Sequence, residues 1–249
     1  MPIVSAAVCP HPPLLVPAVA GGAAAELDDL RAACLAAIDQ LAGADALVII
    51  GSGPVTGVSY DASAGGSFGP YGAPGVSVGS GEPVLPLSLT VGNWLVEQSK
   101  AAGLPRTSIT VAADEPPAGC LALGQQIAQG NYAGDNGGGG GAVTGGGGGS
   151  DEVALLVMGD GSARRSEHSP VHLHPRAELF DNTVAAALDL ADTGTLAALN
   201  PDLATELQAA GRAPWQVLAG ATTTAALKGN LTYHAAPYGV GYFVATWTP

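Results

Sequence analysis

The stretch Cys9-Pro10-His11-Pro12-Pro13 directly follows an apolar run at residues 3–8. A run of this length and composition predicts a buried β-strand. The prolines after it can neither continue a β-ladder nor lie in the interior of a helix, so the strand is expected to end in a rigid loop. His11 then lies at the carboxyl end of a strand, which is where open α/β sheets bind their ligands.

Two further loops of similar character follow predicted strands. Gly51-Ser52-Gly53-Pro54 comes after the apolar residues 46–50, and Gly159-Asp160-Gly161-Ser162 comes after the apolar residues 153–158. In an open α/β sheet the loops at the carboxyl ends of the strands share one edge. We therefore expect three polar, glycine-rich loops to converge on one rim together with His11.

Hydrophobic periodicity predicts alternating strands and helices along the rest of the chain. The predicted strands are residues 3–8, 46–50, 107–112, 153–158, 231–235 and 239–247, and the predicted helices are 23–41, 89–102, 117–129, 176–191, 203–210 and 215–226, with a helical turn at 195–199. The β-α-β beginning requires parallel strands, whereas the last two strands are close enough in sequence for an antiparallel hairpin. The sum is a single α/β domain, residues 1–249, with a mixed central sheet.

Two segments interrupt this pattern. Residues 51–83 are rich in Gly, Pro and Ser and predict a long irregular excursion. Residues 130–151 contain two pure glycine runs, which offer no side chains for packing. We interpret 130–151 as a flexible glycine-rich insertion and not as a domain boundary, because a strand that completes the same sheet follows at once.

Composition excludes several classes of function. Of 249 residues 47% are hydrophobic and only 12% are charged, which indicates a globular and not a disordered chain. Eight Lys and Arg against 21 Asp and Glu give a net charge of -13, which argues against nucleic acid and against an anionic membrane surface as partners. No apolar run is long enough to span a membrane and no signal peptide is evident, so a cytoplasmic location is expected. Cys9, Cys34 and Cys120 are expected to be buried free thiols.

One segment gathers side chains that could ligate a metal. Glu167, His168, His172 and His174 lie close together in sequence, and imidazoles with a carboxylate suit Zn, Fe or Ni. The segment also contains prolines and follows two arginines, which is typical of an exposed loop. Solvated histidines are therefore the favoured interpretation of this segment.

The loop residues admit other chemistry. Gly159-Asp160-Gly161-Ser162 could present backbone N–H groups to an anion, but it lacks the phosphate-binding fingerprint and the lysine of a P-loop. Ser52 or Ser162 could serve a hydrolase as nucleophile, but neither lies in a G-x-S-x-G motif. For Ser52, a tight turn from strand to loop is the better account.

Four blocks of the sequence, taken together, resemble a known family. They are Cys9-Pro10-His11-Pro12-Pro13-Leu14-Leu15-Val16-Pro17; Val157-Met158-Gly159-Asp160-Gly161-Ser162; Ala209-Ala210-Gly211 with Val217-Leu218-Ala219-Gly220-Ala221; and Pro237-Tyr238-Gly239-Val240-Gly241-Tyr242. Their order and spacing resemble the catalytic, LigB-like chains of the class III extradiol ring-cleavage dioxygenases and the related Memo-like proteins. The resemblance implies a three-layer α/β/α domain with a mixed central sheet.

The resemblance also implies a metal site. Active members hold a non-haem Fe(II) with two histidines and one glutamate, and a separate histidine handles protons. His11 matches the first metal histidine, whereas Gly53, Ala163 and Ala209 stand at the positions of the second histidine, the proton-handling histidine and the glutamate. One imidazole cannot hold Fe(II) without the other ligands, because even the loss of outer-shell partners costs about 10- to 100-fold in metal affinity.

These observations predict a LigB-like protein that has lost the Fe(II) site, has no cofactor, and binds a small molecule or acts as a scaffold. The residues expected to line its pocket are His11, Ser52, Gly53, Asp160, Ser162, Ala163 and Ala209. The alternative is an active Fe(II) extradiol dioxygenase with relocated ligands, drawn from Asp160, His168, His172, His174 or Glu206. A homo-oligomer is compatible with either interpretation.

Overall fold

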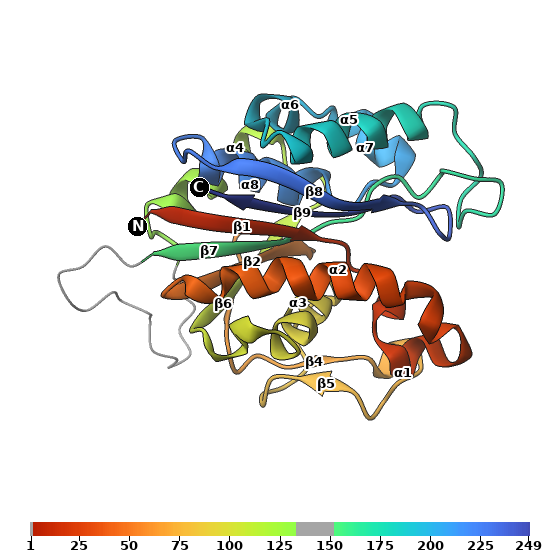
Figure 1. The fold of residues 1–249 in the computed structure, drawn as a ribbon, viewed down its shortest axis with the longest axis horizontal. Helices are drawn as coiled ribbons and strands as arrows, with labels where there is room; N and C mark the ends of the chain where they lie inside the picture. The colour runs from red at the N-terminus through yellow and green to blue at the C-terminus, as the bar shows by residue number, and fades with distance from the viewer. Residues whose placement is uncertain (1, 133–151) are drawn as a thin grey trace.

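The computed structural model describes residues 2–132 and 152–249 (Figure 1). In this part of the chain a seven-stranded sheet has the order β3-β6-β2-β7-β1-β9-β8. The strands are β1 (Ile3–Cys9), β2 (Ala46–Gly53), β3 (Ser59–Asp61), β6 (Arg106–Ala112), β7 (Val153–Met158), β8 (Lys228–Ala235) and β9 (Tyr242–Thr248). The central four, β6, β2, β7 and β1, are parallel, and β3, β9 and β8 are antiparallel to their neighbours. The predicted mixed sheet is confirmed.

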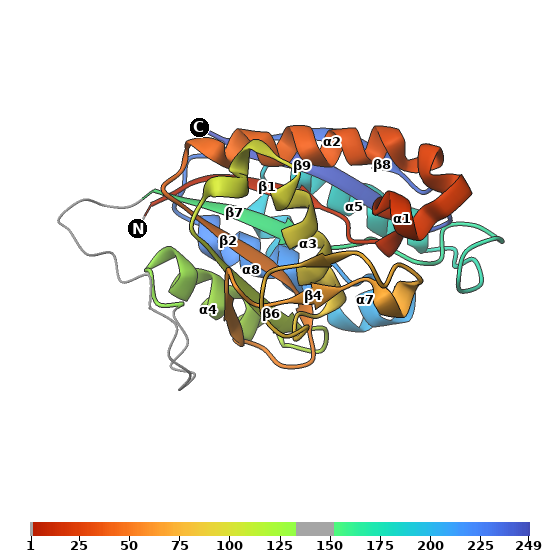
Figure 2. The ribbon, with the colours of Figure 1, turned by 90° about the horizontal axis from the view of Figure 1, so that it is seen from below.

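Helices cover both faces of the sheet, so the predicted three-layer arrangement is also confirmed. On one face lie α2 (Asp28–Asp39) and α3 (Leu87–Glu97), which Figure 2 shows in front of the sheet. The other face is covered by α4 (Pro117–Ala128), α5 (Ala177–Asp189), α6 (Thr193–Ala197), α7 (Pro201–Leu207) and α8 (Arg212–Thr222).

The alternation of side chains along each strand divides the interior into two cores. On β1, Ala6 and Val8 pack with α4, α5 and α8, whereas Ala7 and Cys9 pack with α2 and α3. Because both faces are covered, every residue of β7 is buried. This is why the central strands are continuous apolar runs in the sequence.

Several helices begin or end away from their predicted bounds. The helix predicted at 23–41 is α-helical only from Asp28, since Gly21–Leu27 forms a 3₁₀ helix that starts with Gly21 at φ 56°. The predicted helix at 215–226 instead begins at Arg212 and holds Pro214 in its first turn, where a backbone N–H has no intrahelical acceptor to lose. The helix predicted at 203–210 ends at Leu207, because Gln208 is left-handed with φ 53°.

The excursion at residues 51–83 is more ordered than the sequence suggests. β2 continues to Gly53, β3 adds an edge strand beside β6, and β4 (Gly66–Ser67) pairs with β5 (Ser77–Val78). Close backbone packing needs glycine here, since a Cβ atom on Gly65 would lie 2.3 Å from the carbonyl oxygen of Gly81. Glycine in this segment therefore permits tight folding.

The remaining expectations concern particular segments. Most of the predicted glycine-rich insertion, residues 133–151, lies outside the described residues. Cys9, Cys34 and Cys120 are buried and free, as predicted. Within the described ranges no helix has the length and apolar character needed to cross a bilayer.

Candidate functional site

His11 lies directly after β1 and is held against the loop that follows β7. Its backbone N–H donates a hydrogen bond of 2.8 Å to Oδ1 of Asp160. Its ring atom Nδ1 lies 3.5 Å from the same oxygen, within ion-pair range but without hydrogen-bond geometry. The residue is buried, with 8% of its surface exposed, and Nδ1 has no hydrogen-bond partner among the described residues. The structure thus brings together the predicted residues His11 and Asp160.

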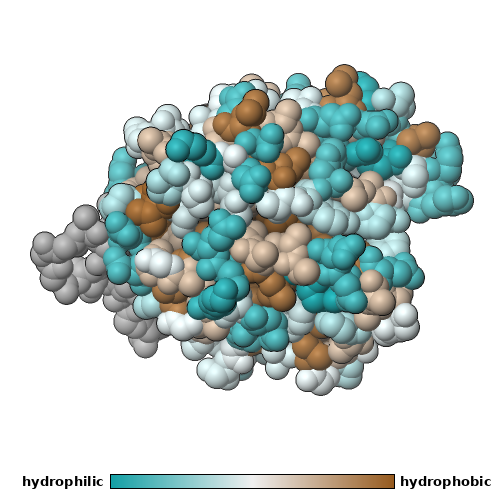
Figure 3. Space-filling model, in the orientation of Figure 1, coloured by the Kyte–Doolittle hydropathy of each residue, from teal (hydrophilic) through white to brown (hydrophobic). Residues whose placement is uncertain are grey.

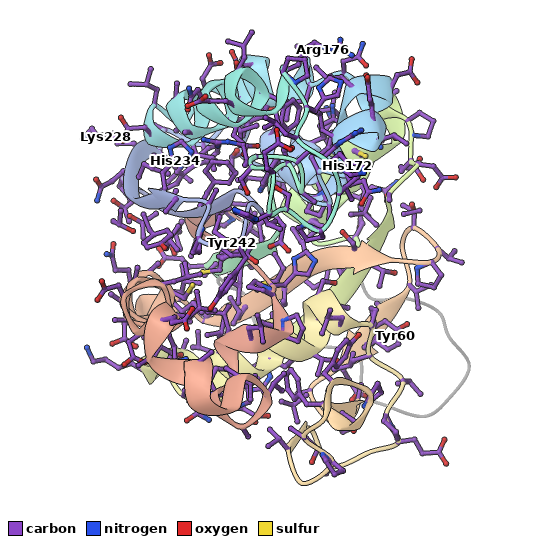
Figure 4. All side chains as sticks on the ribbon, turned by 90° about the vertical axis from the view of Figure 1, so that its right-hand side faces the viewer. Tyr60, His172, Arg176, Lys228, His234 and Tyr242 are labelled. Atoms are coloured by element: carbon purple, nitrogen blue, oxygen red, sulfur yellow. The ribbon has the colours of Figure 1, made fainter. Side chains whose placement is uncertain are left out.

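The carboxyl end of β2, which includes Ser52, is joined to the same edge through the segment that precedes α8. The Ser52 hydroxyl donates a hydrogen bond of 3.0 Å to the carbonyl of Ala210, and the N–H of Gly211 donates one of 2.8 Å to the carbonyl of Asp160. A continuous set of hydrogen bonds therefore joins the ends of β2, β7 and β1, as the strand-end rule predicts. Figure 4 is viewed toward this edge.

Gly53 also lies at this edge, but the space beside it is occupied. A Cβ atom on Gly53 would lie 2.4 Å from Cγ2 and 2.7 Å from Cβ of Thr110. Thr110 is fully buried, and its hydroxyl donates a hydrogen bond of 2.6 Å to the carbonyl of Val55. The space into which a side chain at position 53 would grow is therefore filled by the neighbouring strand.

Ser162, Ala163 and Ala209 contribute to backbone hydrogen bonding and packing in this structure. The Ser162 side chain is fully buried, and its hydroxyl donates a 3.4 Å hydrogen bond to the carbonyl of Leu207. Ala163 donates its N–H to the same carbonyl at 3.0 Å, while Ala209 is buried. The hydroxyls of Ser52 and Ser162 are both donated to carbonyl oxygens, an arrangement that does not activate a nucleophile.

A buried carboxylate holds the loop after β7 in place. Asp181 of α5 is fully buried, accepts the N–H of Ser162 at 2.8 Å and pairs with Arg165 at 2.9 Å. Gly161 and Gly241 lie against this carboxylate: a Cβ atom on Gly161 would lie 2.8 Å from Oδ1, and one on Gly241 would lie 2.2 Å from Oδ2. Burial is the main cause that raises the pKa of Asp181, and the hydrogen bonds from Ser162 and Arg165 oppose it.

Two titratable groups near Asp160 were not predicted as site residues. Burial, reinforced by the charge of Asp160, raises the pKa of the Tyr242 hydroxyl far above its ordinary value. Burial also raises the pKa of Cys34, and smaller contributions come from the Cys9 thiol and from Asp160. Tyr242 is labelled in Figure 4. Its only sequence signal was its place at the end of the fourth block, Pro237 to Tyr242.

Part of the histidine segment gathers around the carboxylate of Glu206. His174 Nε2 lies 2.9 Å from Oε1 of Glu206, and Arg176 pairs with the other oxygen of that carboxylate. His168 and His172 are exposed, and the His172 carbonyl accepts a hydrogen bond from Arg164. Across the ranges 2–132 and 152–249, no group of three or more His, Cys, Asp or Glu side chains could hold a metal ion.

The side chains at the edge do not fit the iron site that the family resemblance implies. His11 faces one carboxylate, Asp160, which is not among the implied ligands. Gly53 is backed by Thr110, and neither Ala163 nor Ala209 offers a donor atom. What the arrangement can supply is an imidazole with an adjacent carboxylate and a serine hydroxyl, at the carboxyl edge of parallel strands.

Comparisons with known proteins bear on the fold alone. No model of a protein family matches the chain, and no curated protein matches it. Among solved structures, the chain is similar to the crystal structure of the uncharacterized protein JW3007 from Escherichia coli K12, with a TM-score of 0.56 and 14% sequence identity. That match covers 99% of this chain and 100% of the other.

Proposed function

We propose that this chain is a LigB-like α/β protein that lacks the iron site of its family and binds a small molecule at the edge formed by His11, Ser52 and Asp160. The observation that carries the proposal is the His11–Asp160 pair, in which a buried imidazole has a nitrogen without a hydrogen-bond partner among the described residues. A buried polar atom left unpaired costs about 1–3 kcal/mol, and a site that tolerates this cost is a candidate for binding.

The chemistry of the pair indicates which ligands suit it. Nδ1 of His11 is buried and faces Asp160, so Nε2 is the ring nitrogen that remains for a ligand; in the tautomer with the proton on Nδ1, it is a hydrogen-bond acceptor. A ligand hydroxyl can donate to that nitrogen, whereas a ligand carboxylate would be repelled by Asp160 and by the net charge of -13. The proposal is therefore for a neutral, hydroxylated small molecule.

Ring cleavage requires more than this pair supplies. An extradiol enzyme must hold the diol and O₂ on one metal and must place an acid–base group beside them. Gly53, Ala163 and Ala209 provide no ligand and no base at the implied positions. Binding without turnover is the function that the residues at this edge support.

Catechol is a suitable neutral probe. We expect isothermal titration calorimetry to detect its binding to the chelator-treated protein, and we expect His11→Ala to weaken binding at least about tenfold, the effect of one lost hydrogen bond of about 1.4 kcal/mol. His168→Ala is the matched control, because His168 is an exposed histidine outside the site.

Two results would contradict the proposal. One is the absence of catechol binding, or equal binding by His11→Ala and the native chain. The other is formation of the ring-opened chromophore after anaerobic loading with Fe(II) and exposure to O₂, abolished by a chelator. That second result would establish the active dioxygenase with relocated ligands.

A further inference from the structure

The outer face of α5 carries exposed apolar side chains that no described segment covers. Leu179 is 70% exposed and Leu190 is 74% exposed. Leu179 lies in the first turn of α5 and Leu190 directly follows its last residue, Asp189, with Thr183 and Ala186 between them at helical spacing. We call Leu179, Asn182, Thr183, Ala186 and Leu190 the α5 outer face; it contains no charged residue. In Figure 3 separate hydrophobic residues appear among hydrophilic ones at the upper margin of the molecule, where Figure 1 places α5.

A hollow lies beside one end of this face. It has a volume of about 390 Å³ and is formed by α5 and the start of α6. Ala186, Leu190, Asp192 and Thr195 are among the residues that line it. The hollow is large enough for an aliphatic side chain, and the small residue Ala186 opens it toward the middle of α5.

We propose that the α5 outer face binds a second copy of this chain, with the two α5 helices antiparallel about a two-fold axis near Thr183 and Ala186. In that arrangement Leu179 of each protomer enters the hollow beside Leu190 of the other. An interface of this kind is self-complementary, because Leu179 and the hollow of each protomer make the same contact with the other protomer. Small residues at the centre allow the helices to approach to the usual interaxial distance of about 8–10 Å.

Charge complementarity favours this occupant. Arg176 directly precedes α5 and pairs with Glu206 of its own chain while its side chain stays 54% exposed, and Asp192 lies beyond the other end of α5 at the rim of the hollow. Antiparallel packing brings Arg176 of each copy toward Asp192 of the partner subunit. Hydrogen bonds from Thr195 lower the pKa of Asp192, so this carboxylate remains ionised. Asp189 is directed elsewhere, since it accepts the N–H of Leu231.

The size of the face sets the expected affinity. A stable interface buries about 800 Å² on each partner, and one helix face with a neighbouring turn supplies less. The two copies also repel, since each carries a net charge of -13. The dimer is therefore weak and depends on concentration and on salt.

Sedimentation velocity of the full chain over a hundredfold range of concentration tests the proposal. We expect the weight-average sedimentation coefficient to rise from the monomer value toward the dimer value as the concentration increases. Leu190→Glu should shift the midpoint at least about tenfold to higher concentration, which corresponds to about 1.4 kcal/mol. Asp192→Asn keeps a residue able to cap α6 and should weaken the dimer by less.

A matched variant and a cross-link make the test specific. Val84→Glu places the same charge on another exposed residue, 53% exposed, on the opposite layer of the fold, and should leave the dimer unchanged. Ala186→Cys should cross-link to its own copy under mild oxidation, because the native cysteines are buried. A chain that stays monomeric at every concentration, or a dimer that Leu190→Glu does not weaken, would overturn the proposal.

Discussion

Gly53 stands at the end of β2 with the side chain of Thr110 directly against it. Because Thr110 is fully buried and its hydroxyl is bonded to Val55, it has no free space into which it can move. The absence of a side chain at position 53 is therefore part of how β2 and β6 pack. A histidine cannot be restored there without repacking the neighbouring strand.

We expect Gly53→His to destabilise the fold by about 1–3 kcal/mol, the usual cost of forcing extra atoms into a packed interior. Urea denaturation measures this change. Ala163→His is the control: Ala163 is only half-buried, so its effect should stay within about 0.5 kcal/mol.

The same argument extends to the metal. We expect a triple variant to hold well under one iron per chain by elemental analysis; its substitutions are Gly53→His, Ala163→His and Ala209→Glu. The histidine at position 53 cannot take its place at the edge without displacing Thr110. A Gly53→His protein as stable as the native chain, together with stoichiometric iron in the triple variant, would show that the edge can be rebuilt.

At the scale of elements, the helices α4 and α8 cross each other with their backbones in direct contact. A Cβ atom on Gly124 would lie 2.1 Å from the carbonyl oxygen of Val217, and one on Gly220 would lie 2.3 Å from that of Leu121. Two glycines thus determine how closely these helices approach. Since Gly211 donates its N–H to Asp160 directly before α8 begins, this crossing also positions the segment that holds Asp160.

Alanine at either glycine should destabilise the fold, although alanine is the better helix former by about 1 kcal/mol. Separating two packed helices costs more than that gain, and we expect a net loss of about 1–3 kcal/mol in Gly124→Ala and Gly220→Ala. Gly43→Ala is the matched control, because nothing lies within 4 Å of its Cβ position.

The control Gly43→Ala should leave the free energy of unfolding unchanged or raise it by about 0.4–1 kcal/mol, because alanine lowers the conformational entropy of the unfolded chain. Thermal and urea unfolding of the three variants measure the differences. Equal stability of all three would mean that the two helices can move apart freely.

For the molecule as a whole, Asp181 connects the loop after β7 to α5 and to the hairpin of β8 and β9. Its carboxylate accepts from Ser162 and Arg165 and is packed against Gly241. An aspartate in the unfolded chain titrates near pH 3.9, and burial raises the pKa of Asp181 in the fold. Between these two pKa values the folded protein binds more protons than the unfolded chain.

The contribution of Asp181 to stability therefore grows as pH falls through that window, opposite to the usual behaviour of a carboxylate. We expect the stability of the native chain minus that of Asp181→Asn to increase from pH 7 toward about pH 4. Asp39, Asp61 and Asp192 have lowered pKa values, so their contributions are lost in acid, but equally in both proteins.

Urea unfolding at a series of pH values measures this difference. A difference that shrinks in acid would mean that the ion pair with Arg165 outweighs burial and that the pKa of Asp181 is lowered in the fold.

Local patterns in the sequence determined six of the seven strands of the main sheet, most helices and the edge at which the loops meet. Apolar runs of five to seven residues followed by glycine or proline leave few alternatives, and parallel strands bring their carboxyl ends to one edge. His11, Ser52 and Asp160 could therefore be placed together from the sequence. The edge strand β3 could not, because three partly exposed residues in a Gly-rich segment carry no periodicity.

Only the tertiary structure decided what each residue at the edge can do. Gly53 was predicted to line a pocket, yet Thr110 from another strand fills the space beside it. Ser162 was also predicted to line the pocket, yet its buried hydroxyl donates a hydrogen bond to the carbonyl of Leu207. Asp181 of α5 and Tyr242 of β9 influence the edge although neither lies in its loops. Periodicity along the chain specifies which face of an element is buried, whereas the neighbour that fills a given space depends on contacts between distant segments, which no local pattern encodes.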